Sequence, residues 1–150
     1  MNIAYLLSCK NITDCGRPIV LPLPSHRGRF PNQLPWPDDG KPRNFLCQYC
    51  KHVYEYTVED VQEGPGVAPA LEKNDRPDTI FQIEARCGEG NCRAPIYILL
   101  VGPSDQSTVG VAHDWFENKE HGTARCSTGH LTGVIQPGSV DAHPLPDWTK

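Results

Sequence analysis

Residues 9–19, CKNITDCGRPI, and residues 87–96, CGEGNCRAPI, decide the fold of this chain. Each stretch holds a pair of cysteines, then two further residues, then a Pro-Ile step that opens an apolar run. The second stretch lies 77 or 78 positions after the first. A pattern that returns at a fixed distance is the sequence signature of an internal repeat.

The same spacing continues beyond these stretches. Trp36 and Trp115 each lie eleven positions before a cysteine that opens a second ligand pair. In the first copy this pair is residues 47–50, CQYC, and in the second copy it is residues 126–130, CSTGH. Landmarks that recur in one order predict a duplicated chain. In that duplication His130 takes the place of Cys50.

Two groups of four metal ligands follow from the repeat. Seven cysteines cannot all form disulfides, because the number is odd. A histidine at the equivalent position raises the ligand number to eight, and two close pairs of thiolate or imidazole ligands make one structural zinc site. The candidate ligands are Cys9, Cys15, Cys47 and Cys50 for one zinc ion and Cys87, Cys92, Cys126 and His130 for the other.

Several alternatives stay open at this point. His121 or His113 can replace His130, and His52 can compete at the first site. An all-thiolate first site also suits iron, whereas a histidine among three cysteines favours zinc. Export from the cell would allow disulfides between Cys9 and Cys15 or between Cys87 and Cys92. We expect positive φ angles at three glycines near the ligands: Gly16, Gly88 and Gly90.

The arrangement of two ligand pairs separated by a loop resembles the zinc-ribbon fold group, over residues 1–60 and 79–136. The resemblance is to the group and to no single family. It implies a small, metal-stabilised all-β fold of two duplicated zinc-ribbon-like units, with short antiparallel strands and long Pro-rich loops. We expect the first unit at residues 1–61, a linker at 62–78, the second unit at 79–136 and an extended tail at 137–150.

Short runs of β-branched and aromatic residues bounded by turn residues predict the strands. They are residues 3–7, 19–23, 53–58, 79–85, 96–101 and 131–135. A turn or two of helix is expected around residues 113–119. We expect Trp36 and Trp115 to lie in the core, because a small unit gains much of its apolar burial from such a side chain.

Composition and charge narrow the function. The net charge of -4 argues against a partner held mainly by phosphate contacts. No apolar run is long enough to span a bilayer, and the N-terminus lacks the basic start of a signal peptide, so we expect a cytoplasmic protein, or a nuclear one in a eukaryote.

Sites closed by four protein ligands leave no open position for catalysis. We therefore expect a non-enzymatic module that binds another protein. The alternative is association with nucleic acid through the loop at residues 26–43. There basic side chains lie beside Phe30 and Trp36, although Asp38 and Asp39 interrupt them.

Overall fold

Short strands make up most of the structure, a computed structural model that describes residues 3–11, 13, 15–21, 36, 40–47, 50–65, 79–102, 115, 117, 122–137 and 143–144. The strands are β1 (Ile3–Ser8), β2 (Pro18–Leu21), β3 (Arg43–Leu46), β4 (Val53–Tyr56), β5 (Gln62–Pro65), β6 (Thr79–Cys87), β7 (Pro95–Gly102), β8 (Ala124–Arg125), β9 (Leu131–Thr132), β10 (Ile135–Pro137) and β11 (His143–Pro144). Within these residues, helix is confined to the 3₁₀ turn η1 (Val58–Asp60), Trp115 and Glu117. The expected small all-β class is confirmed.

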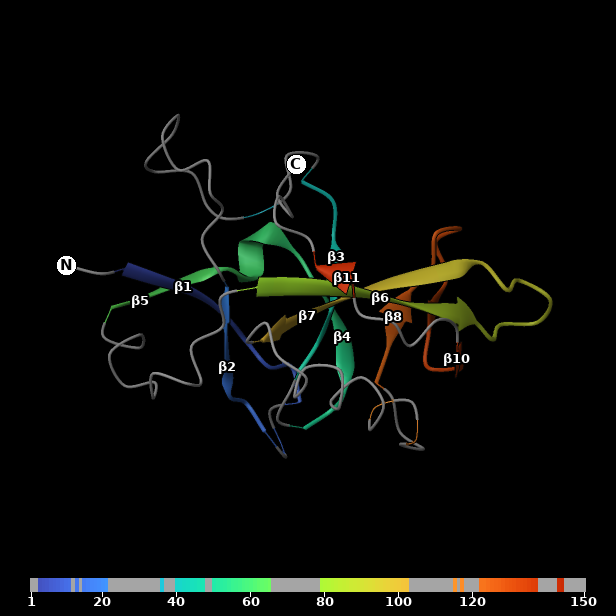
Figure 1. Cartoon of the computed structure of the whole chain (residues 1–150), viewed down its shortest axis with the longest axis horizontal. Helices are drawn as coiled ribbons and strands as arrows, with labels where there is room; N and C mark the ends of the chain where they lie inside the picture. Colours follow the sequence, from blue (N-terminus) through green and yellow to red (C-terminus); the bar gives the residue numbers. More distant parts are fainter. Residues whose placement is uncertain are drawn as a thin grey trace.

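A central sheet has the order β10-β6-β7-β3-β4, and β11 also pairs with β6 (Figure 1). The pairing of β3 with β7 is parallel and sets Asn44 opposite Ile98. The other ladders between strands are antiparallel. A second sheet has the order β2-β1-β5, and β8 and β9 form a small hairpin.

The two faces of the central sheet carry different cores. Strand β7 shows this, because alternate side chains of a strand point to opposite faces. Ile96, Ile98 and Leu100 pack in one core, and Leu99 and Val101 pack in the other. Trp115 lies in the first core and Trp36 in the second, so the prediction that both are core residues is confirmed. The sequence of a strand that is buried on both faces is an almost continuous run of apolar residues, and residues 96–101 are such a run.

The second sheet covers the face that holds Trp36. Leu7 of β1 and Ile19 and Leu21 of β2 belong to the same core as Phe45 of β3. Leu46, the next residue of β3, packs in the core around Trp115. Neighbouring residues of one strand thus supply both cores, and residues from both halves of the chain contribute to each.

Most expected strands are present, with shifted ends. The single strand expected at residues 131–135 is wrong, because β9 ends at Thr132 and β10 begins at Ile135. The hydroxyl of Thr132 accepts a hydrogen bond from the amide of Val134 at 2.9 Å, which turns the chain between the two strands. Strands β3 and β5 were not expected, and β5 lies inside the segment expected to be a linker.

The expected helical turn around residues 113–119 agrees with Trp115 and Glu117, and its other residues lie outside those described. None of the helix within the described ranges is long and apolar enough to cross a membrane.

Candidate metal centres

The eight ligand candidates all lie at the turns of hairpins. In the first half, Cys9 follows β1 and Cys15 precedes β2, while residues 47 and 50 lie in the turn between β3 and β4. In the second half, Cys87 ends β6 and Cys92 precedes β7, while residues 126 and 130 lie in the turn between β8 and β9. Each cluster is therefore formed where the ends of two hairpins meet.

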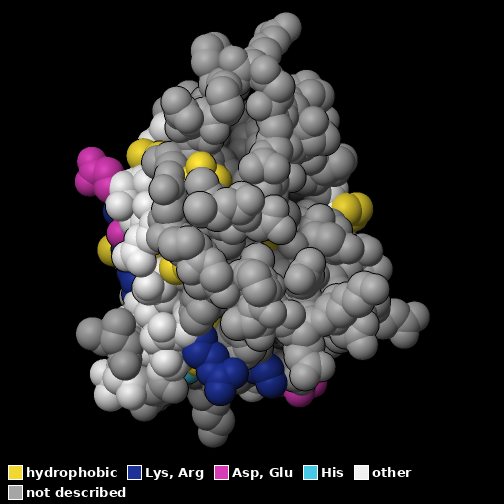
Figure 2. All heavy atoms as spheres, turned by 90° about the vertical axis from the view of Figure 1, so that its left-hand side faces the viewer, with side chains coloured by type: hydrophobic (Ala, Val, Ile, Leu, Met, Phe, Trp, Pro, Cys, Tyr) yellow, Lys and Arg dark blue, Asp and Glu magenta, His cyan; other side chains and the backbone are white. Residues whose placement is uncertain are grey.

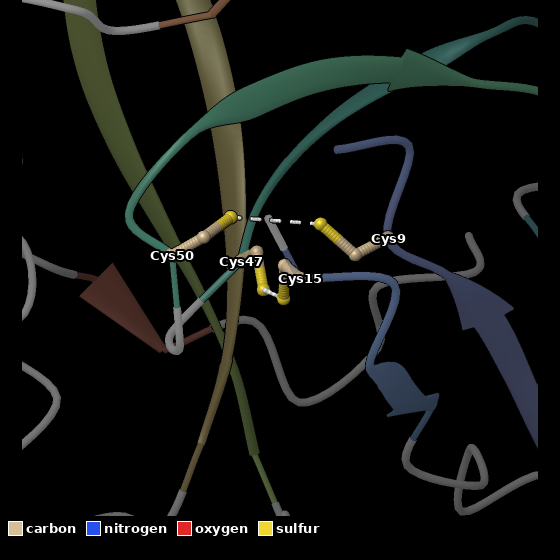
Figure 3. Close-up of side chains that lie close together, drawn as sticks. All are labelled: Cys9, Cys15, Cys47 and Cys50. Atoms are coloured by element: carbon tan, nitrogen blue, oxygen red, sulfur yellow. Dashed lines mark hydrogen bonds between the residues drawn. The ribbon is translucent and has the colours of Figure 1, made fainter. Parts of the chain in front are cut away.

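The first cluster joins four sulfur atoms (Figure 3). The Sγ atoms of Cys9 and Cys50 are 3.6 Å apart, and those of Cys15 and Cys47 are 3.7 Å apart. Four thiolates around a tetrahedral zinc ion lie about 3.8 Å from one another, given a Zn–S distance of about 2.3 Å. A disulfide needs sulfur atoms only about 2 Å apart, and all seven cysteines are free thiols. This cluster can hold one metal ion.

The second cluster joins three sulfurs and one imidazole nitrogen. The Sγ atoms of Cys92 and Cys126 are 3.8 Å apart. Nδ1 of His130 lies 3.2 Å from Sγ of Cys92 and 3.6 Å from Sγ of Cys126. The ligand atoms of all four residues, Cys87 included, lie within 4.8 Å of one another. The structure thus places His130 beside the three cysteines, and this set can also hold one metal ion.

Backbone amides point at the thiols of both clusters. For five cysteines the amide lies two residues further along the chain and lowers the pKa of the thiol. These amides are at Asn11 for Cys9, Arg17 for Cys15, Glu89 for Cys87, Ala94 for Cys92 and Thr128 for Cys126. Hydrogen bonds to the charged form of a group favour that form. The turns are therefore shaped to stabilise thiolates.

The pKa is nevertheless raised at the first cysteine of each half, with burial as the largest cause. Burial raises the pKa of the Cys9 thiol to about 11, and it also raises the pKa of the Cys87 thiol. Burial also acts to raise the pKa of the Cys15 thiol, but the amide of Arg17 and the other three thiols of the cluster together lower it. A divalent cation at the centre of a cluster would favour the thiolate form of every cysteine at once.

A threonine hydroxyl adds to the second cluster. Oγ1 of Thr128 lies 3.0 Å from Sγ of Cys126 and 3.2 Å from Sγ of Cys92. This contact is the main cause of the lowered pKa of the Cys92 thiol. Burial acts to raise the pKa of Cys126, but the hydroxyl and the nearby amides lower it to about 6. Sequence reasoning missed Thr128, whose only signal was its place between two ligands.

The ligand turns need unusual backbone angles. Gly16 and Gly90 have positive φ angles of 66° and 54°, as predicted. Gly88 does not, so that prediction is wrong. Gly88 is required for another reason, because a Cβ atom there would lie 2.7 Å from the carbonyl oxygen of Val134. Its own amide donates to that oxygen at 2.7 Å.

A buried hydroxyl ties together the two hairpins of the second cluster. Thr132 is 2% exposed, and its Oγ1 donates to the carboxylate of Glu89 at 2.7 Å. Glu89 lies in the turn between Cys87 and Cys92, whereas Thr132 follows His130 on β9. The two ligand pairs are thus held together by contacts of the protein itself.

Other histidines named as candidates take different places. Nδ1 of His52 lies 2.9 Å from the carbonyl oxygen of Cys50, and its ring stacks on Tyr54. His52 is not among the four residues of the first cluster. His113 and His121 lie outside the described residues.

The loop at residues 26–43 also lies mostly outside the described residues. Its Trp36 is 3% exposed, and the indole nitrogen donates to the carbonyl oxygen of Lys41 at 3.0 Å. Trp36 is therefore part of the core and does not offer a ring on which a base could stack.

Basic side chains follow the ligands of the first cluster closely. Lys10 comes directly after Cys9, Lys51 directly after Cys50, and Arg17 two residues after Cys15. In Figure 2, Lys and Arg side chains gather at the lower edge of the side that faces the viewer. Four thiolates around a divalent cation leave a net charge of about -2, which neighbouring cations offset.

Comparison of the chain with family models, with curated proteins and with solved structures finds no match.

Proposed function

We propose that this chain is a non-enzymatic, zinc-binding protein with two structural zinc ions, and that it acts as a protein–protein interaction module. The observation that carries the proposal is the pair of four-ligand clusters, in which ligand atoms from separate hairpins lie within 4.8 Å of one another. Sulfur–sulfur distances of 3.6 to 3.8 Å are those of thiolates around one tetrahedral ion.

The donor atoms favour zinc over other metals. Thiolates and imidazole exclude calcium and magnesium, which prefer oxygen ligands. An all-thiolate set also suits iron, but three cysteines with one histidine are a common structural zinc set. Because both clusters belong to one chain built on one plan, we propose the same ion for both.

A closed ligand set supports a structural role. Catalytic zinc keeps a position for water or substrate, and four protein ligands fill a tetrahedral ion completely. Metal binding to such a site stabilises the fold by about 10–16 kcal/mol. A chain of 150 residues in which two cores share one sheet gains stability from ions at the ends of its hairpins.

We also propose a duplicated, tandem zinc-ribbon origin, which matching strand registers support. Ser8 pairs with Pro18 as Arg86 pairs with Pro95 in the second half. The later hairpins agree only in their first strand, because Leu46 and Arg125 each directly precede a cysteine. Leu46 pairs with Val53, three residues after Cys50, whereas Arg125 pairs with Leu131, directly after His130. The fifth strand of each half pairs with the first strand, β5 with β1 and β10 with β6.

Exposed apolar side chains beside the second cluster support the interaction role. Leu131 and Val134 are each 53% exposed; Leu131 begins β9, and Val134 lies in the turn between β9 and β10. Large apolar side chains that lie together at a surface are typical of protein contacts. We assign partner binding to this turn.

Metal analysis of the purified chain tests the zinc sites. The wild type should carry two equivalents of zinc, and chelation should unfold it. Cys9→Ser with Cys50→Ser should leave one equivalent, and Cys92→Ser with His130→Ala should leave the other. His52→Ala is the matched control, because His52 lies beside the first cluster without belonging to it, and two equivalents should remain. Fewer than two tightly bound ions in the wild type would rule out the proposal.

Serine substitutions at the surface test the partner role. Leu131→Ser with Val134→Ser should keep two equivalents of zinc but lose the proteins that the wild type retains in affinity capture. Gln136→Ser is the control, because it changes a neighbouring exposed side chain without removing apolar surface. If the double variant retains the same proteins as the wild type, this turn does not bind the partner.

A further inference from the structure

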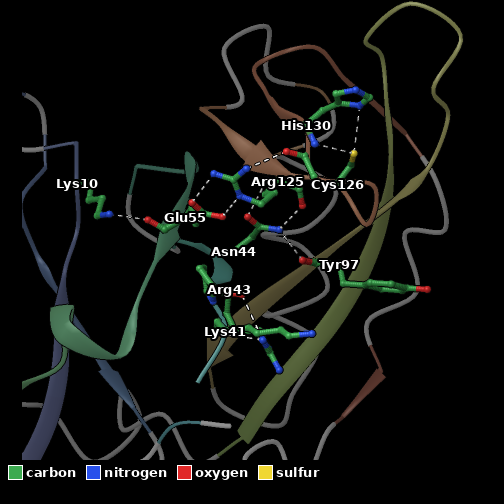
Figure 4. A network of polar contacts seen from close by, with 11 residues as sticks. Lys10, Lys41, Arg43, Asn44, Glu55, Tyr97, Arg125, Cys126 and His130 are labelled. Atoms are coloured by element: carbon green, nitrogen blue, oxygen red, sulfur yellow. Dashed lines mark hydrogen bonds and ion pairs between the residues drawn. The ribbon is translucent and has the colours of Figure 1, made fainter. Parts of the chain in front are cut away.

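A chain of polar contacts joins the two clusters, and we propose that through it the two metal sites load cooperatively. The inference rests on the proposed zinc sites. It adds that metal at one site raises the affinity of the other, and that the contact between Glu55 and Arg125 carries much of this effect (Figure 4).

Arg125 is the contact at the second site. It directly precedes Cys126, and its Nη1 donates to the carbonyl oxygen of Gly129 at 2.8 Å, inside the turn that holds Cys126 and His130. The same guanidinium donates to both carboxylate oxygens of Glu55, at 2.5 Å from Nε and 3.1 Å from Nη2. A two-pronged contact of this kind fixes both distance and orientation.

Glu55 leads on to the first site. It lies on β4, which leaves the turn that holds Cys50. Its carbonyl oxygen accepts a hydrogen bond of 2.6 Å from Nζ of Lys10. Lys10 follows Cys9, and its amide donates to the hydroxyl of Tyr56 at 3.0 Å. Glu55 therefore contacts residues next to ligands of both sites.

Asn44 braces the same junction from β3. It is 6% exposed and lies three residues before Cys47. Its Oδ1 accepts from the amide of Arg125 at 2.9 Å, and its Nδ2 donates to the carbonyl oxygens of Arg125 and Tyr97, both at 3.0 Å. The main chain that enters the second site is thus held by the strand that enters the first.

The direction of the coupling follows from ordering. Metal at the first site fixes the turn between β3 and β4, and with it the positions of Asn44 and Glu55. These residues then hold Arg125 before the second ion arrives, so the second ion no longer has to order that segment. A ligand that binds an already ordered protein loses less conformational entropy, which is positive cooperativity. The effect is reciprocal, because it is a property of the two binding free energies.

Cobalt titration measures the coupling site by site. Co²⁺ bound by four sulfurs absorbs differently from Co²⁺ bound by three sulfurs and a nitrogen, so each site has its own signal. The second site should bind Co²⁺ about 5- to 150-fold more weakly when Cys9→Ser and Cys50→Ser disable the first site, the range of typical allosteric couplings. The ratio of the second site's Co²⁺ affinities with the first site intact and with it disabled measures the coupling. In the Arg125→Met background this ratio should fall toward one.

The chain offers a matched control for this variant. Arg86 directly precedes Cys87, as Arg125 precedes Cys126, and its Nη2 lies 3.3 Å from Oε2 of Glu84. The Arg86 side chain is 44% exposed and that of Arg125 is 42% exposed, but the Arg86 pair lies within one strand. Arg86→Met should therefore keep the full ratio. If the affinity ratio fell toward one equally in Arg125→Met and in Arg86→Met, the role of Glu55 and Arg125 in the coupling would be overturned.

The cooperativity can also be tested on the wild type, so that the result does not depend on whether a variant folds. At one equivalent of zinc, native mass spectrometry should show mainly chains with no ion or with two, and the one-ion form should be the minor species. A dominant one-ion form that fills to two would overturn the cooperativity and leave the zinc sites intact. Chains that never bind an ion would instead contradict the proposed function.

Discussion

At the scale of single residues, the ligand turns depend on φ angles that most amino acids disfavour. Gly16 and Arg93 follow the second cysteine of equivalent turns, with φ angles of 66° and 51°. A side chain in this left-handed region costs about 1–2 kcal/mol relative to glycine. At this position the first half avoids the cost and the second half bears it, whereas Lys51, which follows Cys50 in the first half, has a φ angle of 60°.

Exchanging the residue types tests this difference. Gly16→Ala should lower the free energy of unfolding by about 1–2 kcal/mol, and Arg93→Gly should raise it by up to about 1 kcal/mol. Urea unfolding of the metal-loaded protein measures both changes. Arg17→Gly is the control, because Arg17 has no positive φ, so glycine there relieves no backbone strain and adds chain entropy. Destabilisation by Arg93→Gly would contradict the argument.

The residues of the two clusters could be predicted from the sequence, whereas the residues that position them could not. A cysteine pair has a fixed chemical use, and its recurrence identified His130 even though the residue type differs. Asn44 gave no such signal, because one amide in a short segment is typical of a loop. Its role depends on Arg125, which the fold brings beside it.

At the scale of elements, the strands with regular apolar patterns were predictable. A strand was expected at residues 79–85, and β6 is there; from Phe81 to Cys87 its side chains alternate between buried and partly exposed. Strand β5 has the sequence QEGP, which has low strand propensity. It forms because β1 presents a free edge, and it pairs there with Ile3 to Leu6. Pairing with a distant segment overrides local preference, and no local pattern reports it.

At the scale of the whole molecule, the two halves share one sheet and both cores. Strand β3 pairs with β7, and Gly122 approaches Val53 so closely that a Cβ atom would lie 2.8 Å from the amide nitrogen of Val53. Each core mixes residues from both halves. A shared sheet of this kind favours a single unfolding transition.

The two core tryptophans can test this cooperativity. Trp36→Phe with Trp148→Phe leaves Trp115 as the only fluorophore of its kind, and Trp115→Phe with Trp148→Phe leaves Trp36. Within each variant, the fluorescence transition should coincide with the transition measured by far-ultraviolet circular dichroism. Separate transitions, with one tryptophan core melting before the secondary structure, would show that the halves unfold independently.

The parallel pairing of β3 with β7 also bears on synthesis at the ribosome. Asn44 pairs with Ile98, so the central sheet cannot close until the second half has emerged. Until then the nascent first half presents the edge of β3 and the apolar side chain of Leu46 without their partners. The four cysteines of the first cluster are by then already outside the ribosome. An ion bound there would secure the early hairpins during the interval in which the unfinished chain is most exposed to aggregation.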